Sequence, residues 1–201
     1  LIDRESVSMV SLMDHSPGQR QYADHSKYRE YYQGKYSLTD AQMQQYEEEQ
    51  LALAARWSQP NRETIAAMCR ARHIALASLD AASLAHVAES PQLGSVIAEF
   101  PTTFEAAEAS RKHGMNVLMG APNIVRGGSH SGNVAASELA QLGLPDILSS
   151  DYYPASLLDA AFRVADDESN RFTLPQAVKL VTKNPAQALN LQDRGVIGEG
   201  K

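Results

Sequence analysis

The sequence predicts an α/β fold built on parallel strands, because short apolar runs alternate with stretches of helical spacing along most of its length. Each apolar run is bounded by Gly, Pro, Ser or Asp, which is typical of buried strands. The predicted strands span residues 7–14, 74–78, 96–100, 116–121 and 146–151. A strand followed by a helix, repeated in this way, indicates that each connection crosses back to a parallel neighbour.

The predicted helices are recognisable by the residues at their ends. Capping boxes at Thr39 and Thr102 begin two of them, and glycines at 114 and 143 end two. Asn184 and Pro185 interrupt the helix that follows Thr173, because proline cannot continue a helix interior. The helices are therefore expected over residues 39–57, 102–114, 134–142, 154–164 and 173–184.

Composition excludes several classes of protein. The chain has 201 residues, 43% of them hydrophobic and 21% charged, a net charge of -6 and a single cysteine. Collagen, low-complexity disorder, a disulfide scaffold and a basic nucleic-acid arm do not have this composition. No apolar run reaches the ~18 residues of a membrane span, and the first residues do not resemble a signal peptide. We therefore expect a cytoplasmic protein with neither nucleic acid nor membrane as its partner, in which Cys69 fills a buried position on a helix.

Residues 20–36 combine five tyrosines with four Lys and Arg residues, beginning at Arg20. Such a segment could stack a base or sugar while Arg20 and its neighbours hold a phosphate. An amphipathic surface helix or a contact between subunits would have the same composition. The residues alone leave these alternatives open.

Polar clusters follow the predicted strands, at the edge of a parallel sheet where functional residues gather. His15 could ligate a metal, with Asp14 as a second ligand or a hydrogen-bond partner; alternatively it is a hydrogen-bonded histidine at a strand end. Asp151 could bind a metal and take a proton from a bound water. Its alternative is to cap the helix that begins near Pro154.

The segment after the fourth strand has the composition of an anion-binding loop. Glycines let backbone amides approach an anion, an arginine can grip phosphate with two hydrogen bonds, and a helix start adds a favourable dipole. The segment matches neither the P-loop nor the dinucleotide-binding pattern, and a flexible loop is the alternative. The predicted substrate-binding residues are Asn123, Arg126, Gly127, Gly128, Ser129 and His130, together with Arg20.

Four segments carry a resemblance to a known family. They are Ser-Leu-Met-Asp-His-Ser-Pro-Gly-Gln-Arg at 11–20, Glu-Phe-Pro-Thr-Thr-Phe-Glu-Ala-Ala at 99–107, Met-Gly-Ala-Pro-Asn-Ile-Val-Arg-Gly-Gly-Ser-His-Ser-Gly-Asn at 119–133 and Ile-Leu-Ser-Ser-Asp-Tyr-Tyr-Pro at 147–154. Together they closely resemble the ribose 1-alkylphosphonate 5-triphosphate diphosphatases of the amidohydrolase superfamily, which belong to the carbon–phosphorus lyase pathway of bacterial phosphonate catabolism. The resemblance implies a (β/α)8 barrel, of which the five strand–helix units here would be strands four to eight.

The resemblance also implies an activity and a site. The enzyme would be a metal-dependent hydrolase that cleaves the 5-triphosphate of a ribose 1-alkylphosphonate to the 5-phosphate and pyrophosphate. The divalent metal would be zinc, with manganese or magnesium as alternatives, and His15 and Asp151 would hold it. The loop from Asn123 to His130 would bind the triphosphate. The expected partners are this phosphorylated ribose and further copies of the chain in a homo-oligomer.

Two departures from the family pattern qualify the resemblance. The family has Ser-His-Asp-Asp-Ala-Thr after the second strand, whereas this chain has Leu79 and Ala81 in place of the histidine and the second aspartate. Leucine donates no lone pair, so the metal site is weakened unless Asp80 or Glu99 substitutes. The His-x-His pair of the first barrel strand is absent.

These departures suggest a segment of the enzyme. Residues 1–190 would be the barrel segment, and residues 191–201 would begin a small flanking β-domain. The alternative is a non-catalytic relative that binds a phosphorylated ribose or a partner subunit.

Overall fold

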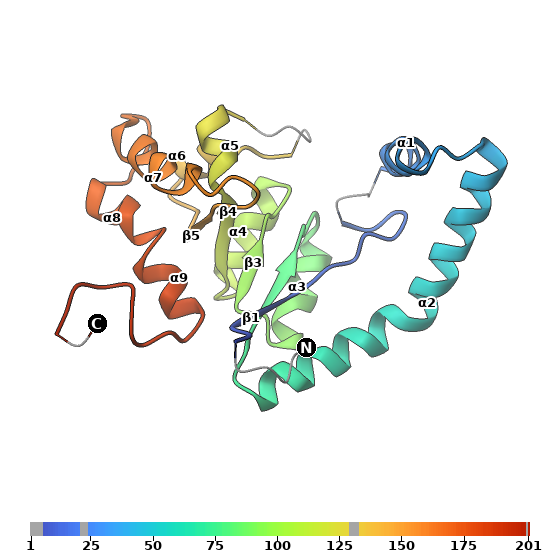
Figure 1. The fold of residues 1–201 in the computed structure, drawn as a ribbon, viewed down its shortest axis with the longest axis horizontal. Helices are drawn as coiled ribbons and strands as arrows, with labels where there is room; N and C mark the ends of the chain where they lie inside the picture. Colours follow the sequence, from blue (N-terminus) through green and yellow to red (C-terminus); the bar gives the residue numbers. More distant parts are fainter. Residues whose placement is uncertain (1–5, 21–23, 129–132, 200) are drawn as a thin grey trace.

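The computed structural model describes residues 6–20, 24–128, 133–199 and 201, and its centre is one parallel sheet (Figure 1). The sheet has five strands in the order β1-β2-β3-β4-β5. The strands are β1 (Met9–Leu12), β2 (Ala75–Leu79), β3 (Ile97–Glu99), β4 (Asn116–Gly120) and β5 (Ile147–Ser149). All five predicted strands are confirmed, and their ends agree with the prediction to within two residues.

The strand order follows the chain order, and every neighbouring pair is parallel. Doubly wound sheets reverse their order at a switch point, whereas a (β/α)8 barrel adds each strand beside the preceding one. The sheet is therefore consistent with part of a barrel. Its assignment to barrel strands four to eight stays a prediction.

Helices connect the strands and cover the sheet (Figure 1). They are α1 (His25–Tyr36), α2 (Asp40–Ala71), α3 (Leu84–Leu93), α4 (Phe104–Lys112), α5 (Ala121–Arg126), α6 (Ala136–Gln141), α7 (Ser156–Asp166), α8 (Leu174–Lys179) and α9 (Lys183–Ala188). The five predicted helices correspond to α2, α4, α6, α7 and α8. The helix after Thr173 is interrupted, but not at the predicted place. α8 ends at Lys179, and Asn184 and Pro185 lie in the first turn of α9, where proline is tolerated.

Three features of the helices differ from the predictions. α2 runs to Ala71 with Pro60 inside it, so the predicted helix over residues 39–57 and the helical spacing predicted around Cys69 belong to one element. α3 was not predicted, although Ser83 caps its first turn and Gly94 ends it in the left-handed conformation. α5 occupies the start of the predicted loop: proline lies in its first turn and Gly127 ends it.

The main core lies between β4, β5 and the helices α5 to α8, and includes Leu139, Leu148 and Val164. A second cluster packs the carboxyl-terminal half of α2 on β1 and β2 and includes Cys69, which is 1% exposed. Burial raises the pKa of the Cys69 thiol, and the predicted role of Cys69 as a buried filler is confirmed.

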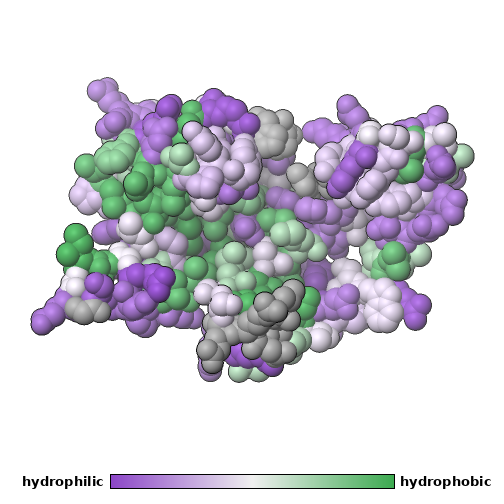
Figure 2. Space-filling model, in the orientation of Figure 1, coloured by the Kyte–Doolittle hydropathy of each residue, from purple (hydrophilic) through white to green (hydrophobic). Residues whose placement is uncertain are grey.

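Residues 25–36 form the amphipathic helix that was one of the alternatives for the tyrosine-rich segment. Tyr28 is 1% exposed and packs on Met43 of α2, and the ring centroid of Tyr32 lies 4.5 Å from that of Tyr28. The tyrosine rings thus hold α1 against the outer end of α2. This helical arm stands away from the sheet in Figure 1, and in Figure 2 it is largely hydrophilic, whereas the side of α6 to α8 carries more apolar surface.

Among the described residues, no helix, not even α2, is both long enough and apolar enough to cross a membrane. After α9, residues 191–199 form turns and bends. The boundary between a barrel segment and a flanking β-domain near residue 190 stays a prediction.

Candidate functional site

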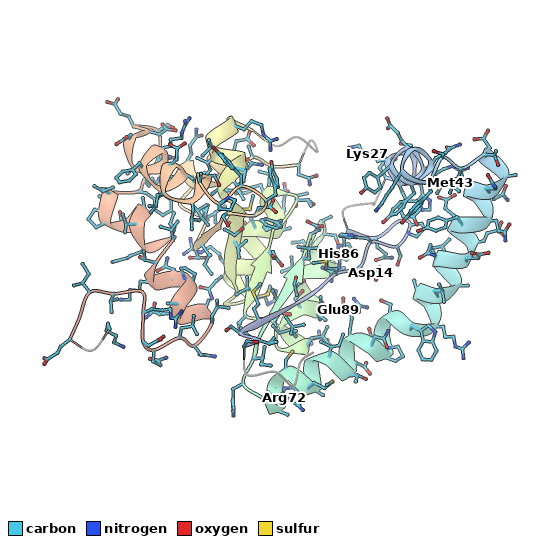
Figure 3. All side chains as sticks on the ribbon, viewed as in Figure 1. Asp14, Lys27, Met43, Arg72, His86 and Glu89 are labelled. Atoms are coloured by element: carbon cyan, nitrogen blue, oxygen red, sulfur yellow. The ribbon has the colours of Figure 1, made fainter. Side chains whose placement is uncertain are left out.

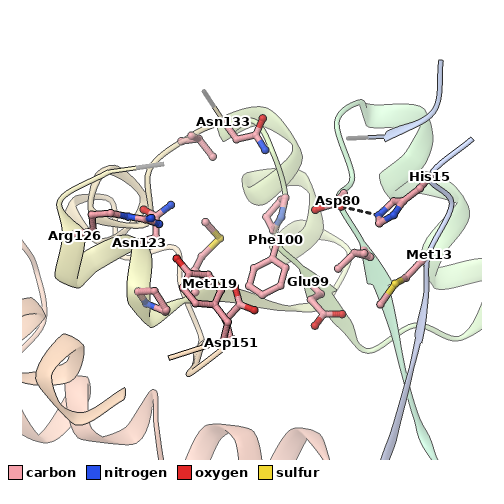
Figure 4. A pocket seen from close by; sticks show the side chains of 16 residues that line it. Met13, His15, Asp80, Glu99, Phe100, Met119, Asn123, Arg126, Asn133 and Asp151 are labelled. Atoms are coloured by element: carbon pink, nitrogen blue, oxygen red, sulfur yellow. Dashed lines mark ion pairs between the residues drawn. The ribbon is translucent and has the colours of Figure 1, made fainter. Parts of the chain in front are cut away.

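A cavity of about 480 Å³ opens at the carboxyl ends of the strands, in the position that parallel topology predicts (Figure 4). Its walls come from the segments that follow all five strands. The lining side chains that bear on the chemistry are His15, Leu79, Asp80, Glu99, Asn123, Arg126, Asn133 and Asp151. The polar clusters that the sequence placed at separate strand ends therefore meet in one cavity.

His15 and Asp80 bring their side chains together in the cavity. His15 Nε2 lies 3.4 Å from Asp80 Oδ2, so the connection after β1 meets the end of β2 (Figure 4). The Asp80 amide donates a hydrogen bond of 2.9 Å to the Glu99 carbonyl oxygen, which ties the end of β2 to β3. Asp80 is 8% exposed, so this carboxylate is held within the protein rather than in solvent.

Glu99 ends β3 and lines the same cavity. Burial raises the pKa of the Glu99 carboxyl, and the nearby charges of Asp80 and Asp151 raise it further. A hydrogen bond of 2.5 Å from Ser11 Oγ opposes the rise by stabilising the ionised form. Acidic groups from three strand ends thus repel one another in this cavity, an arrangement that favours binding of a proton or a cation.

Left-handed backbone conformations direct several residues at this edge of the sheet. Asp80 follows β2 with φ of 54°, Phe100 follows β3 with φ of 51°, and Asp151 follows β5 with φ of 48°. Residues other than glycine rarely adopt positive φ, and where they do, the strain often accompanies a functional site. Each of these turns leaves its residue among those that line the cavity.

Asp151 does not cap the following helix. α7 begins at Ser156, Ala155 precedes it, and no side chain forms the capping hydrogen bond. The alternative interpretation of Asp151 as a helix cap is therefore wrong, because residues 152–155 separate it from the helix. Asp151 lines the cavity instead, as a candidate acid–base group requires.

Asn123 and Arg126 form the wall across the cavity from His15 and Asp80 (Figure 4). They lie on α5 rather than on a glycine loop, which corrects the prediction for this segment. Asn123 Oδ1 accepts a hydrogen bond of 2.9 Å from the Ala136 amide and so fixes α5 to the start of α6. Gly127 and Gly128 follow the helix with positive φ, whereas Ser129 and His130 lie outside the described residues.

Two predicted site residues take other places. Asp14 turns toward α2 and accepts hydrogen bonds from Ser58 Oγ at 2.9 Å and Ser16 Oγ at 2.6 Å, which help to lower its pKa although burial opposes them. Arg20 is 5% exposed, and its guanidinium contacts the end of β2 from within the protein. Neither residue lines the cavity.

The resemblance noted from the sequence implies a divalent metal at this edge of the sheet. Imidazole and carboxylate groups suit zinc or manganese. However, no three His, Cys, Asp or Glu side chains among the described residues lie close enough together to hold a metal ion. Leu79 also lines the cavity and has no lone pair to donate to a metal. The described residues therefore offer the His15–Asp80 pair and do not form a complete metal centre.

Sequence reasoning missed the apolar part of the cavity. Phe100, Met119 and Tyr152 line it, and each lies within or beside a strand-end motif whose polar groups alone indicated a function. An aromatic residue directly after a strand is a weak signal, since most such residues belong to the core. Only its positive φ sets Phe100 apart, and the sequence does not reveal φ.

The chain is similar in sequence to a known protein family and to one curated protein. A model of the amidohydrolase family matches residues 13–201. Alpha-D-ribose 1-methylphosphonate 5-triphosphate diphosphatase of Escherichia coli (strain K12) is 90% identical to the chain over 201 residues, which are 100% of this chain and 53% of that protein. The chain thus spans about half the length of this curated relative. No solved structure matches the chain significantly. Because the family model matches nearly the whole length of the chain, the chain belongs to the amidohydrolase family.

Proposed function

We propose that this chain supplies one side of the active site of a diphosphatase that acts on a ribose 1-alkylphosphonate 5-triphosphate. The bond cleaved would be the anhydride bond between the α- and β-phosphates, with water as the second reactant and the 5-phosphate and pyrophosphate as products. The 90% identity to a protein that is named for this substrate and reaction supports the proposal.

The observation that carries the proposal is the division of the cavity into two chemically different walls. The acidic wall contains His15, Asp80 and Glu99, and the opposite wall contains Arg126 and Asn123 (Figure 4). A triphosphate needs cationic and hydrogen-bonding groups for its oxygens, whereas a water nucleophile needs a proton acceptor nearby. The two walls present these groups on opposite sides of one space.

We assign a role to each residue that faces this space. Arg126 and Asn123 would bind phosphoryl oxygens, with Gly127 and Gly128 beside them, and the Arg126 guanidinium would offset the charge that develops on these oxygens. Asp151 would accept the proton of the attacking water. His15 and Asp80 are the residues that we would expect nearest a divalent cation, with Glu99 facing the same space. Zinc as the metal, a cytoplasmic location and a homo-oligomer remain expectations.

A second candidate function has one observation in its favour. Leu79 lies in the cavity among the acidic groups, and the described residues do not complete a metal centre. A chain of this kind could bind a phosphorylated ribose without hydrolysing it. The two functions share the Arg126 wall and differ in whether Asp151 meets a reactive water.

The experiment measures pyrophosphate release from ribose 1-methylphosphonate 5-triphosphate, together with substrate affinity by calorimetry. We expect Asp151→Asn to lower kcat by about 100-fold or more with little change in affinity, as for loss of a general base. Arg126→Ala should weaken binding by roughly 10-fold or more, the loss expected when a charge-assisted hydrogen bond is removed.

Asp166→Asn, at the exposed end of α7, is the matched control for Asp151→Asn. Substrate binding without pyrophosphate release would favour the second function. Unchanged affinity in Arg126→Ala would exclude that residue from the phosphate site in both functions.

A further inference from the structure

A buried guanidinium lies directly behind the acidic wall of the cavity. Arg20 has a side chain that is 4% exposed, and its backbone has φ of 47°. Burial lowers the pKa of Arg20 from its ordinary value, and the nearby Glu89 carboxylate opposes this effect. Arginine remains charged throughout the working pH range of proteins, so the fold must supply hydrogen-bond acceptors for this cation.

Those acceptors are the last residues of β2. Arg20 Nη1 donates to the Leu79 carbonyl oxygen at 2.7 Å and to Ser78 Oγ at 3.0 Å. Ser78 is fixed from the other side, because Ser90 Oγ of α3 donates to Ser78 Oγ at 2.8 Å. The guanidinium therefore fixes the backbone of the residue that immediately precedes Asp80.

A second ion pair orients Arg20. Its Nη2 lies 3.9 Å from Glu89 Oε2, and the same oxygen accepts a hydrogen bond of 3.0 Å from Arg62 Nη1 of α2. Glu89 is thus shared by two arginines from different elements. Figure 3 shows Glu89, His86 and Asp14 gathered between the sheet and α2.

His15 and Arg20 belong to the same connection after β1, and both reach the end of β2. His15 contacts Asp80 in the cavity, whereas Arg20 holds Leu79 and Ser78 from behind. The connection therefore contacts the end of β2 at two successive residues, Leu79 and Asp80. We propose that Arg20, oriented by Glu89 and Arg62, is a positioning residue that sets the distance between His15 and Asp80.

This inference rests on the proposed function, because it treats His15 and Asp80 as part of the working site. The sequence predicts that Arg20 contacts the substrate directly. The present proposal instead gives Arg20 a role in orienting the site. The alternative is that Arg20 only stabilises the packing of α3 on the sheet. In that case its removal would lower stability without a specific effect at His15.

The test compares the chain with its Arg20→Ala and Glu89→Gln variants at one fixed pH. The readouts are the exchange rate of the Asp80 amide and the nitrogen and proton NMR signals of the His15 imidazole, assigned with His15→Gln. In Arg20→Ala we expect exchange of the Asp80 amide to rise about 10-fold or more, the factor that corresponds to one lost charge-assisted hydrogen bond. The His15 signals should shift in the same variant.

Glu89→Gln keeps the Arg20 side chain and should show smaller changes in the same direction. This variant tests the proposal if Arg20→Ala does not fold. Arg111→Ala is the matched control, because Arg111 also donates to a carbonyl oxygen, that of Gly143 at 2.6 Å, and pairs with a carboxylate, Asp146 at 3.4 Å. It acts at the amino end of β5, away from the cavity. The control should leave the His15 signals unchanged and should raise exchange of the Asp80 amide by no more than its loss of overall stability accounts for.

The proposal is overturned if the foldable Arg20 or Glu89 variants leave the Asp80 amide and the His15 signals unchanged, or if Arg111→Ala shifts them equally. Neither readout depends on turnover. Failure of the unmodified chain to release pyrophosphate would count against the proposed function alone, and the comparison of variants would still decide the role of Arg20.

Discussion

Leu79 and Glu99 pair in register across β2 and β3, and both side chains line the cavity. A leucine that is 6% exposed therefore lies beside a carboxylate whose pKa is raised by burial. The apolar neighbour offers no hydrogen bond to that carboxylate and no lone pair to a cation. The leucine that replaces the family's histidine is thus the direct neighbour of the carboxyl group whose pKa is raised.

We expect Leu79→His to strengthen zinc binding. The new imidazole would join the His15–Asp80 pair and Glu99 at the same edge of the cavity and raise the number of donors there. The gain in affinity should be at least about 10-fold, the size of effect that weaker, indirect ligand contacts already have.

Calorimetric titration with zinc alone measures this gain. Leu84→His, at a leucine that is 63% exposed at the start of α3, is the control and should not change the affinity. Equal affinities for the unmodified chain and Leu79→His would show that Leu79 does not limit the site.

Glu99→Gln should stabilise the fold at neutral pH. The raised pKa means that the folded state holds more protons than the unfolded state at pH values just above 4.5, so the stability of the unmodified chain falls as pH rises through this window. Glutamine removes the buried charge while its carbonyl oxygen can still accept the hydrogen bond from Ser11. We expect a gain of about 0.5–2 kcal/mol in the free energy of unfolding at pH 7.

Urea unfolding at pH 4 and pH 7 measures both the gain and its pH dependence. Glu30→Gln, on the exposed face of α1, should change neither. A lower stability of Glu99→Gln at pH 7 would mean that the Glu99 charge is compensated in the folded protein.

Arg111→Ala should destabilise the amino end of β5. Burial raises the pKa of Asp146, while the Val117 amide and the Arg111 charge stabilise its ionised form. Loss of the guanidinium leaves a half-buried carboxylate and the Gly143 carbonyl oxygen without this partner. The expected cost is about 1 kcal/mol, because the arginine itself is partly exposed and its charge is screened by solvent.

Thermal unfolding measures this cost. Arg163→Ala removes an exposed ion pair with Asp159 on α7 and should cost less than Arg111→Ala, because solvent screens an exposed pair. If the two variants are equally stable, the Arg111–Asp146 contact contributes nothing beyond a surface pair.

Gly195→Ala should loosen the segment after α9. Gly195 has φ of 92°, and an added Cβ would lie 2.7 Å from the Ala186 Cβ and 3.1 Å from the Thr182 carbonyl oxygen. Strain and steric overlap together should cost about 1–3 kcal/mol locally.

Limited proteolysis of the segment after α9, combined with thermal unfolding, measures this effect. Gly34→Ala is the control, because nothing lies within 4 Å of the added Cβ in α1. Alanine should stabilise that helix by up to about 1 kcal/mol, the reverse of the effect expected at Gly195. Unchanged proteolysis in Gly195→Ala would show that the segment can move to accommodate the methyl group.

The sequence by itself determined the parallel strands, most of the connecting helices and the edge of the sheet where the site lies. Strand and helix periodicities are local, and parallel topology then brings the strand ends at His15, Glu99 and Asp151 to one cavity whatever the details of packing. The burial of Cys69 followed from the same helical spacing.

The tertiary structure alone decided which side chains face that cavity. Asp14 and Arg20 lie in the same polar connection as His15, yet they turn toward Ser58 and the end of β2. Asp80, Phe100 and Asp151 are directed by left-handed backbone conformations that no local pattern signals in residues other than glycine. The amides of Asp80 and Phe100 donate hydrogen bonds to the carbonyl oxygens of Glu99 and Leu118 on the neighbouring strands. The direction of these side chains therefore depends on contacts that form only when the chain has folded.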